Sequence, residues 1–229
     1  MRARPAAPFP RRSSRPILWP SAGPTYAQPS IDSDPYAFVP FRGGYAVVDA
    51  AGNDLLRVDP SGKVSVLAVF PTHPTALTRA ERKQHRPTAP PVLPVQSVPS
   101  SLAVGPDGAL YVGEFTGWPY RIGSARVWRV VPGKKPTVFA SGFTNIADLA
   151  FDGRDLLVLE LASKGLQNPA STGELIRVGA NGARTVLAAK GLVDPTGLAV
   201  GKGWIYVSNY GTYPGTGPAP HGELVRLRT

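Results

Sequence analysis

The sequence contains no cysteine, no long apolar run and none of the common catalytic motifs. Without cysteine, the chain has no disulfides and no thiolate metal sites. No stretch of 18 apolar residues is present, so no transmembrane helix is predicted. There is also no Gly-x-Ser-x-Gly motif, no phosphate-binding loop and no dinucleotide fingerprint. No sequence motif therefore indicates a serine nucleophile or a nucleotide site.

The net charge of +10 is unevenly distributed. Residues 1–30 hold five arginines and no acid, and residues 71–97 hold four basic residues and one acid, which leaves 16 basic and 14 acidic residues elsewhere. Both basic segments are rich in proline, and the remainder is nearly neutral. Because nucleic-acid-binding proteins usually carry their basic surface on the fold itself, we expect no nucleic-acid partner.

Residues 1–31 are predicted to be a disordered, Pro/Arg-rich tail. Seven prolines rule out a continuous helix or a central strand. The pair Arg11-Arg12 is followed by only three apolar residues, 17–19, before the next proline. A secretory signal peptide needs roughly 7 to 15 apolar residues at that point, so we find no credible signal peptide.

From residue 32 onward, one unit of four short β-type runs recurs four times. The middle of the unit reads DLLRVDPSG, RVWRVVPGKK, ELIRVGANG and ELVRLR. Connections of two to five residues with glycine, asparagine and aspartate favour antiparallel hairpins. Corresponding leucines lie 47 and 49 residues apart (Leu102, Leu149, Leu198), which is typical of propeller blades. A β-sandwich is the alternative.

The sequence thus predicts an all-β propeller over residues 32–229, with blades at about 35–70, 99–143, 146–192 and 195–229. Residues 71–97 interrupt the period. We expect them to form a surface excursion whose prolines exclude strands, with one or two helical turns near residues 75–85. The last repeat has no fourth strand. An open arc would expose blade edges, so we expect that self-association can occur there.

Several stretches resemble the ScyD/ScyE family of propeller proteins, which are related to NHL-repeat and streptogramin-lyase-like propellers. They are AGNDLLRVDPSGKVS, VPSSLAVGPDGALYVGEFTG, SGFTNIADLAFDG, TGELIRVGANGARTVLA and GLVDPTGLAVGKGWIYVSNYGT. The resemblance covers most of residues 32–229. It implies an exported six-bladed ring, extracellular or periplasmic, of which this chain apparently lacks the first two blades and the signal peptide.

One position at the end of each second strand is acidic or an amide in every repeat. The four residues are Asp49, Glu114, Glu160 and Asn209. In a propeller they should lie on the face of the disc that carries the loops between second and third strands, and Asp148 should lie near them. Such oxygen ligands suit Ca²⁺ or Mg²⁺, and such a cation could activate water in a lactonase-like hydrolase or lyase. The alternative is that these side chains accept hydrogen bonds that fix the loops.

The loops between second and third strands are long and carry aromatic residues. These are Trp118, Tyr120, Tyr210 and Tyr213, and they are either ligand contacts or covers for the sheet ends. An arginine recurs in each third strand, at Arg57, Arg129, Arg177 and Arg226. We expect the arginines to make a structural ion pair or hydrogen bond between blades; ligand binding is the alternative. The three histidines, His73, His85 and His221, are predicted to lie in loops outside the carboxylate ring.

Taken together, the residues favour a non-enzymatic propeller that binds a small molecule or a protein through the face with the long loops. No cofactor is required by this reading. A divalent-cation-dependent hydrolase or lyase that uses the ring of carboxylates is the alternative.

Overall fold

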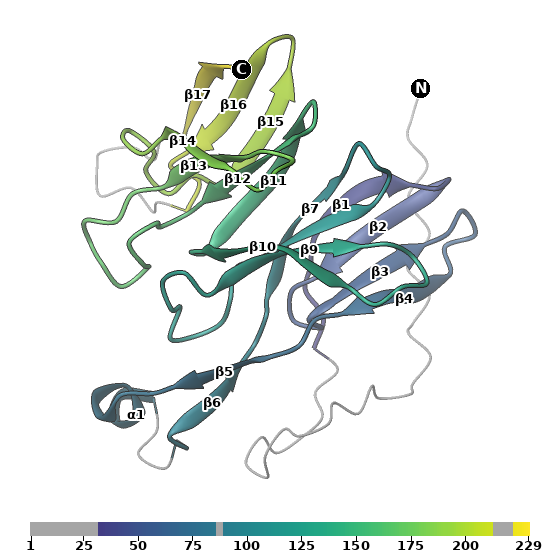
Figure 1. Cartoon of the computed structure of the whole chain (residues 1–229). Helices are drawn as coiled ribbons and strands as arrows, with labels where there is room; N and C mark the ends of the chain where they lie inside the picture. The colour runs from purple at the N-terminus through teal and green to yellow at the C-terminus, as the bar shows by residue number, and fades with distance from the viewer. Residues whose placement is uncertain (1–31, 86–88, 213–221) are drawn as a thin grey trace, which may run out of the picture.

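The computed structural model describes residues 32–85, 89–212 and 222–229 of the chain (Figure 1). This part is almost entirely β-structure, with one short helix, α1. The strands form four larger antiparallel sheets arranged like blades and one separate two-stranded hairpin. The predicted all-β propeller architecture is confirmed.

In each blade the strands follow one another in sequence order. Blade 1 contains β1 (Pro35–Phe41), β2 (Gly44–Asp49), β3 (Asp54–Val58) and β4 (Val64–Val69). Blade 2 contains β7 (Pro99–Val104), β8 (Leu110–Glu114), β9 (Ala125–Val130) and β10 (Thr137–Phe143). Blade 3 contains β11 (Ile146–Asp152), β12 (Asp155–Glu160), β13 (Glu174–Val178) and β14 (Arg184–Ala188). Blade 4 contains β15 (Gly197–Gly201), β16 (Trp204–Asn209) and β17 (Glu223–Arg228).

The turn between the first two strands has the same backbone requirement in every blade. One glycine in each turn has a positive φ, between 62° and 77°: Gly43, Gly108, Gly153 and Gly203. An L side chain is disfavoured there, whereas glycine adopts this conformation at no steric cost. The repeated glycines therefore set the tight hairpins that the sequence predicts.

The hydrophobic core lies between the blades, in three layers. Blade 1 packs on blade 2 through residues such as Leu55 and Leu110, both fully buried. Blades 2 and 3 share a second cluster around Val127 and Val158, and blades 3 and 4 share a third. Because side chains alternate between the two faces of a strand, each inner sheet is apolar on both faces. The first strands of successive blades contact one another, β1 with β7, β7 with β11 and β11 with β15.

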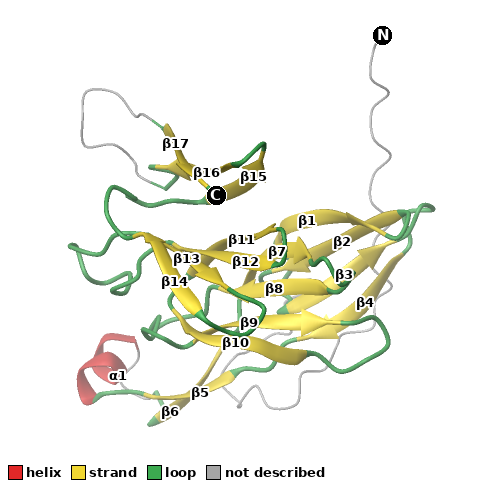
Figure 2. Ribbon diagram, turned by 45° about the horizontal axis from the view of Figure 1, so that its top comes forward, coloured by secondary structure: helices red, strands yellow, loops and turns green. Residues whose placement is uncertain are grey.

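Residues 71–97 differ from the prediction in one respect. They form a two-stranded antiparallel sheet, β5 (His73–Ala76) and β6 (Val92–Val95), with α1 (Arg79–His85) between the strands. The expected helical turn is present, but the expectation that prolines exclude strands was wrong. Pro74 pairs with Pro94, and both strands of a two-stranded sheet are edge strands, where proline is tolerated. The hairpin and α1 lie to one side of the blades (Figures 1 and 2).

The predicted disordered tail, residues 1–31, lies outside the described residues, as do Tyr213 and His221. Within the described part, no helix has the length and apolar character needed to cross a membrane.

Candidate functional site

The residues that end the second strands are buried and share one structural task. Asp49 and Glu114 are fully buried, and Glu160 and Asn209 are at most 4% exposed. Each accepts a hydrogen bond from the segment that leads into the first strand of its own blade. The donors are Asp34 N to Asp49, Ser97 Oγ to Glu114, Thr144 N to Glu160 and Val193 N to Asn209, at 2.6–2.8 Å. These bonds tie the entry of each blade to its second strand.

Glu114 accepts hydrogen bonds at both of its carboxylate oxygens. Its Oε1 accepts from Ser97 Oγ at 2.8 Å and from the indole Nε1 of Trp128 at 2.6 Å, and its Oε2 accepts from the backbone N–H of Arg126 at 3.0 Å. The Nε2 of His73 lies 3.1 Å from both oxygens. The expectation that no histidine reaches the carboxylates was therefore wrong, because His73 begins β5 and is buried against blade 2.

Glu160 is held by far fewer contacts. Thr144 N donates to its Oε1 at 2.7 Å, and the carboxylate of Glu174 lies opposite on the neighbouring strand. Burial raises the pKa of Glu160 to about 7, and repulsion from Glu174 adds to that, while the Thr144 hydrogen bond opposes it. Glu160 is therefore a carboxyl group that exchanges a proton near neutral pH.

Asp148 bridges the first strands of blades 3 and 4. Its Oδ2 accepts from the backbone N–H of Leu198 at 2.7 Å, and its Oδ1 accepts from Leu149 N at 2.8 Å. Burial raises the pKa of Asp148 to about 6, although both hydrogen bonds act to lower it. The contact across 50 residues of sequence shows Asp148 linking two neighbouring blades.

These contacts bear on the Ca²⁺ or Mg²⁺ expectation. A divalent cation of this kind needs several converging oxygens that are free to coordinate it. In residues 32–85, 89–212 and 222–229, no three His, Cys, Asp or Glu side chains form such a group. Both carboxylate oxygens of Asp49 and of Glu114 already accept N–H or O–H hydrogen bonds. The arrangement fits loop anchoring better than metal binding.

The prediction that the recurring arginines join neighbouring blades was wrong. Their polar contacts lie within their own blade. Arg129 pairs with Asp107 at 2.6 Å, and Arg177 pairs with Asp152 at 3.0 Å, in each case with the turn between the first two strands. Arg57 donates to the carbonyl of Arg42 in the equivalent turn. The turn of blade 4 has no acid, and there Arg226 lies over the ring of Trp204 at 4.5 Å.

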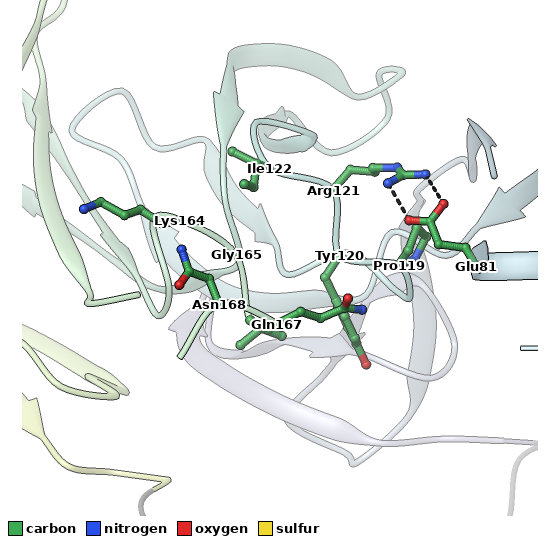
Figure 3. Close-up of a pocket in the computed structure, with 10 residues that line it drawn as sticks. Glu81, Pro119, Tyr120, Arg121, Ile122, Lys164, Gly165, Gln167 and Asn168 are labelled. Carbon is green, nitrogen blue, oxygen red and sulfur yellow. Dashed lines mark hydrogen bonds and ion pairs between the residues drawn. The ribbon is translucent and has the colours of Figure 1, made fainter. Parts of the chain in front are cut away.

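A pocket of about 470 Å³ lies where the long loops of blades 2 and 3 meet α1 (Figure 3). Its lining residues come from these three segments and are Glu81, Pro119, Tyr120, Arg121, Ile122, Lys164, Gly165, Leu166, Gln167 and Asn168. The two loops lie in close contact inside the pocket. A Cβ atom added to Gly165 in the blade 3 loop would lie 3.2 Å from the side chain of Ile122 in the blade 2 loop. The pocket is thus shaped by contact between neighbouring blades.

The blade 2 loop is firmly placed. Its residues 115–117 donate three backbone hydrogen bonds of 2.9–3.0 Å to the carbonyls of residues 96–98. Further along, the guanidinium of Arg121 binds both oxygens of Glu81 on α1, at 2.6 and 2.7 Å, and the carbonyl of Ala76 at 2.7 Å. The Arg121 hydrogen bonds hold the pKa of Glu81 down at about 2. The helix is therefore clamped onto the loop through a bidentate ion pair.

The blade 3 loop contributes Lys164, Gln167 and Asn168 to the polar part of the pocket lining. Lys164 N is bonded to Ser171 Oγ, and Asn168 Oδ1 accepts from Ala170 N, so the loop is closed by its own hydrogen bonds. Lys164 is exposed and forms no ion pair with any described residue. Since Arg121 is neutralised by Glu81, the pocket lining keeps one uncompensated positive charge.

Of the predicted loop aromatics, the structure places Tyr120 in the pocket lining and Trp118 and Tyr210 outside it, all three half-buried. Sequence reasoning missed Glu81, Arg121, Lys164 and Asn168. The motif Thr78-x-x-Glu81 was a usable signal for the start of α1, because the two residues exchange capping-box hydrogen bonds. Nothing in the sequence paired Glu81 with Arg121, 40 residues away.

No family model and no curated protein matches the sequence. The fold does match solved structures. One is a catalytically inactive virginiamycin B lyase from Staphylococcus aureus with quinupristin, 15% identical over 86% of this chain and 57% of that chain, with a TM-score of 0.53. Another is a gluconolactonase from Xanthomonas campestris, 16% identical over 81% and 54%, with a TM-score of 0.51. The nidogen/laminin complex also matches, 13% identical over 81% and 55%, with a TM-score of 0.51.

These neighbours are β-propellers, and the chain belongs to the same fold class. It spans little more than half the length of each of these structures. At such low identity the likeness concerns the fold alone.

Proposed function

We propose that this protein is a non-enzymatic β-propeller that binds a small anionic ligand in the pocket between the long loops of blades 2 and 3. The observation that carries the proposal is the pocket itself. Two hydrogen-bonded loops form it together with α1, which Arg121 holds through Glu81. It lies on the face of the blades that carries the long loops between second and third strands. Binding residues commonly lie on loops that a rigid scaffold positions.

The lining is suited to binding rather than to nucleophilic chemistry. It contains no serine, threonine, cysteine or histidine, and its one carboxylate, Glu81, is occupied by Arg121. Lys164 supplies a positive charge and Asn168 and Gln167 supply amides, while Tyr120 and Ile122 supply apolar surface. We infer a ligand that carries a carboxylate or similar anion attached to a ring or another apolar body.

A matched pair of probes tests this class of ligand. Benzoate and benzamide have the same ring, and only benzoate is charged. We expect calorimetry or NMR titration to show benzoate binding about fivefold more tightly than benzamide, a difference of about 1 kcal/mol. Lys164→Gln should abolish the preference, and Tyr120→Ala should weaken both probes. Lys134→Gln, in an exposed turn of blade 2, is the control and should change neither.

Equal affinity of the wild-type protein for the two probes would contradict the charge assignment. Absence of binding of either probe at concentrations in the millimolar range would remove the pocket as the binding site.

The resemblance to the ScyD/ScyE family does not supply an activity, but it extends the proposal to a place outside the cytoplasm. The resemblance implies six-bladed, exported rings, and this chain covers only 57% and 54% of two solved propellers with the same fold. We propose that the protein acts as a ScyD/ScyE-like extracellular or periplasmic binding protein. Recovery of the natural protein from culture medium or a periplasmic extract is the observation that tests this location.

A second candidate is a cation-dependent hydrolase or lyase, and one observation favours it. Glu160 and Asp148 have pKa values raised to about 7 and about 6, so either can exchange a proton near neutral pH. The fold is also shared with a gluconolactonase and a virginiamycin B lyase. The hydrogen bonds at Asp49 and Glu114 weigh against it. A titration in which neither Ca²⁺ nor Mg²⁺ binds removes this candidate.

A further inference from the structure

The ion pair in the pocket lining shows what one end of the pocket is built to bind. The guanidinium of Arg121 donates to both carboxylate oxygens of Glu81, at 2.6 and 2.7 Å (Figure 3). Two parallel N–H···O bonds from one guanidinium to one carboxylate are the geometry in which proteins recognise carboxylate ligands. Glu81 therefore occupies, from within the chain, a position that suits the carboxylate of a bound molecule.

Arg121 is held in place by contacts that do not involve Glu81. The carbonyl of Arg121 accepts hydrogen bonds from Ser124 Oγ at 2.6 Å and from Ser124 N at 3.2 Å. The backbone N–H of Gly123 donates to Thr144 Oγ1 at 3.0 Å, which fixes the same loop to the segment leading into blade 3. The backbone that presents the guanidinium is thus positioned whether or not Glu81 is bound to it.

Glu81 belongs to a segment that can give way. The insertion that carries it is anchored at its base, where the buried His73 places its Nε2 3.1 Å from Glu114. In α1 itself, no side chain of residues 79–84 is buried. Loss of the ion pair would therefore free α1 from the blade 2 loop without detaching the hairpin from blade 2.

The exchange of Glu81 for another carboxylate should cost little. The side chains of Arg121 and Glu81 are 37% and 18% exposed, so an anion from solution can reach the pair. Solvent-exposed ion pairs contribute little net stability. Glu81 also keeps a second partner, because its Oε2 accepts from Thr78 N at 2.7 Å in the capping box that begins α1.

The second positive group of the pocket lies away from this pair. Figure 3 shows Lys164 and Arg121 at opposite ends of the lining. A ligand held at Lys164 by one carboxylate would present a second carboxylate to Arg121 at high effective concentration, as displacement of an intramolecular competitor requires. A ligand with one carboxylate lacks this advantage and would bind at Lys164, whose charge is uncompensated.

We infer that Arg121 is a second anion-binding residue of this pocket, that Glu81 is its internal competitor, and that the ligand is a dicarboxylate or a similar dianion that displaces Glu81. This inference rests on the proposed function, because it places the first acidic group of the ligand at Lys164. It adds the second charge of the ligand and the residue that selects for it.

Terephthalate and 4-carbamoylbenzoate test the ligand class, since they share one shape and differ by one charge. We expect calorimetry to show that the wild type binds terephthalate about threefold more tightly, and that Glu81→Gln raises this preference to about thirtyfold. Glutamine also serves in a capping box, so α1 keeps its start. Arg121→Gln should abolish the preference. Asp32→Asn removes an exposed acid outside the pocket lining and should leave the preference unchanged.

The role of Arg121 has a separate test that uses benzoate and benzamide. Lys164→Gln alone should remove the preference for benzoate, and the double variant Lys164→Gln/Glu81→Gln should restore it, because Arg121 is then uncompensated. No restoration, or a terephthalate preference that Glu81→Gln leaves unchanged, overturns this inference while the proposed function stands.

Failure of the proposed function gives a different result. The wild type would then bind neither benzoate nor terephthalate. Terephthalate binding by Glu81→Gln would even so support Arg121 as an anion-binding residue with Glu81 as its competitor, and absence of binding by this variant would overturn that assignment too.

Discussion

Glu114 and Glu160 occupy the same position in neighbouring blades, yet their surroundings differ sharply. Glu114 is contacted by Ser97, Trp128, Arg126 and His73, and the last of these comes from the hairpin outside the blades. Glu160 accepts one bond, from Thr144, and faces a second carboxylate, Glu174. With so few donors around it, burial raises the pKa of Glu160 to about 7.

The difference shows that a repeat position does not determine a chemical role. The second strand ends in a carboxylate in both blades because each blade needs an acceptor for the segment that enters it. The remaining environment differs between the blades, because Trp128 donates to Glu114 and His73 lies beside it, whereas Glu174 faces Glu160. Hydrogen-bond donors stabilise a buried carboxylate, whereas a like charge destabilises it. Glu114 is an anchor of the fold, and Glu160 is an anchor that can also bind a proton.

The largest effect should come from removing the Glu114 side chain. Glu114→Ala leaves the buried donors of Ser97, Trp128 and His73 without an acceptor, and each orphaned group costs about 1 to 3 kcal/mol. We expect the free energy of unfolding to fall by about 3 to 5 kcal/mol. Chemical denaturation followed by tryptophan fluorescence measures it.

The matched substitution Glu160→Ala orphans only the Thr144 N–H, and it should cost less than about 2 kcal/mol. Equal losses in the free energy of unfolding for Glu114→Ala and Glu160→Ala would contradict the proposed difference between the two blades.

A smaller, pH-dependent effect is expected from Glu160→Gln. The pKa of Glu160 is raised from 4.5 to about 7, so between these values the folded state holds a proton that the unfolded state has lost. This group's contribution to stability is therefore present at low pH and is lost as the pH rises to about 7. Because a tenfold difference in proton affinity between the two states is worth about 1.4 kcal/mol, the loss reaches at most about 3 kcal/mol.

Glutamine keeps the oxygen that accepts from Thr144 but does not ionise, so the variant should lose less stability as the pH rises and should exceed the wild type above neutral pH. Asp148, whose pKa is also raised, will leave some dependence in both proteins. Urea denaturation at several pH values checks this, and parallel curves for the two proteins would argue that Glu160 ionises normally.

The blades could be predicted from the sequence because their signals are local. Alternating apolar residues indicated the strands, and glycines such as Gly108 indicated the turns. The repeat also identified the buried ends of the second strands. The contacts of Glu114 with His73 and of Glu81 with Arg121 could not be predicted, because each joins segments about 40 residues apart through an insertion that has no counterpart in the other blades.

The arginines illustrate the same limit. The alternation of side chains along the third strand correctly predicts that Arg129 points away from the apolar face that packs on the preceding blade. It does not reveal the partner, which is an aspartate in the adjoining turn of the same blade. Only the three-dimensional position of Asp107 decides between a contact within a blade and one across blades.

The central claim is that the carboxylates at the ends of the second strands fix loops and do not hold a metal ion. Calorimetric titration of the wild-type protein with Ca²⁺ and then with Mg²⁺ tests it most directly. We predict no saturable binding of either ion, with Glu160→Gln indistinguishable from the wild type. Stoichiometric binding that Glu160→Gln abolishes would contradict the account and would favour the cation-dependent hydrolase.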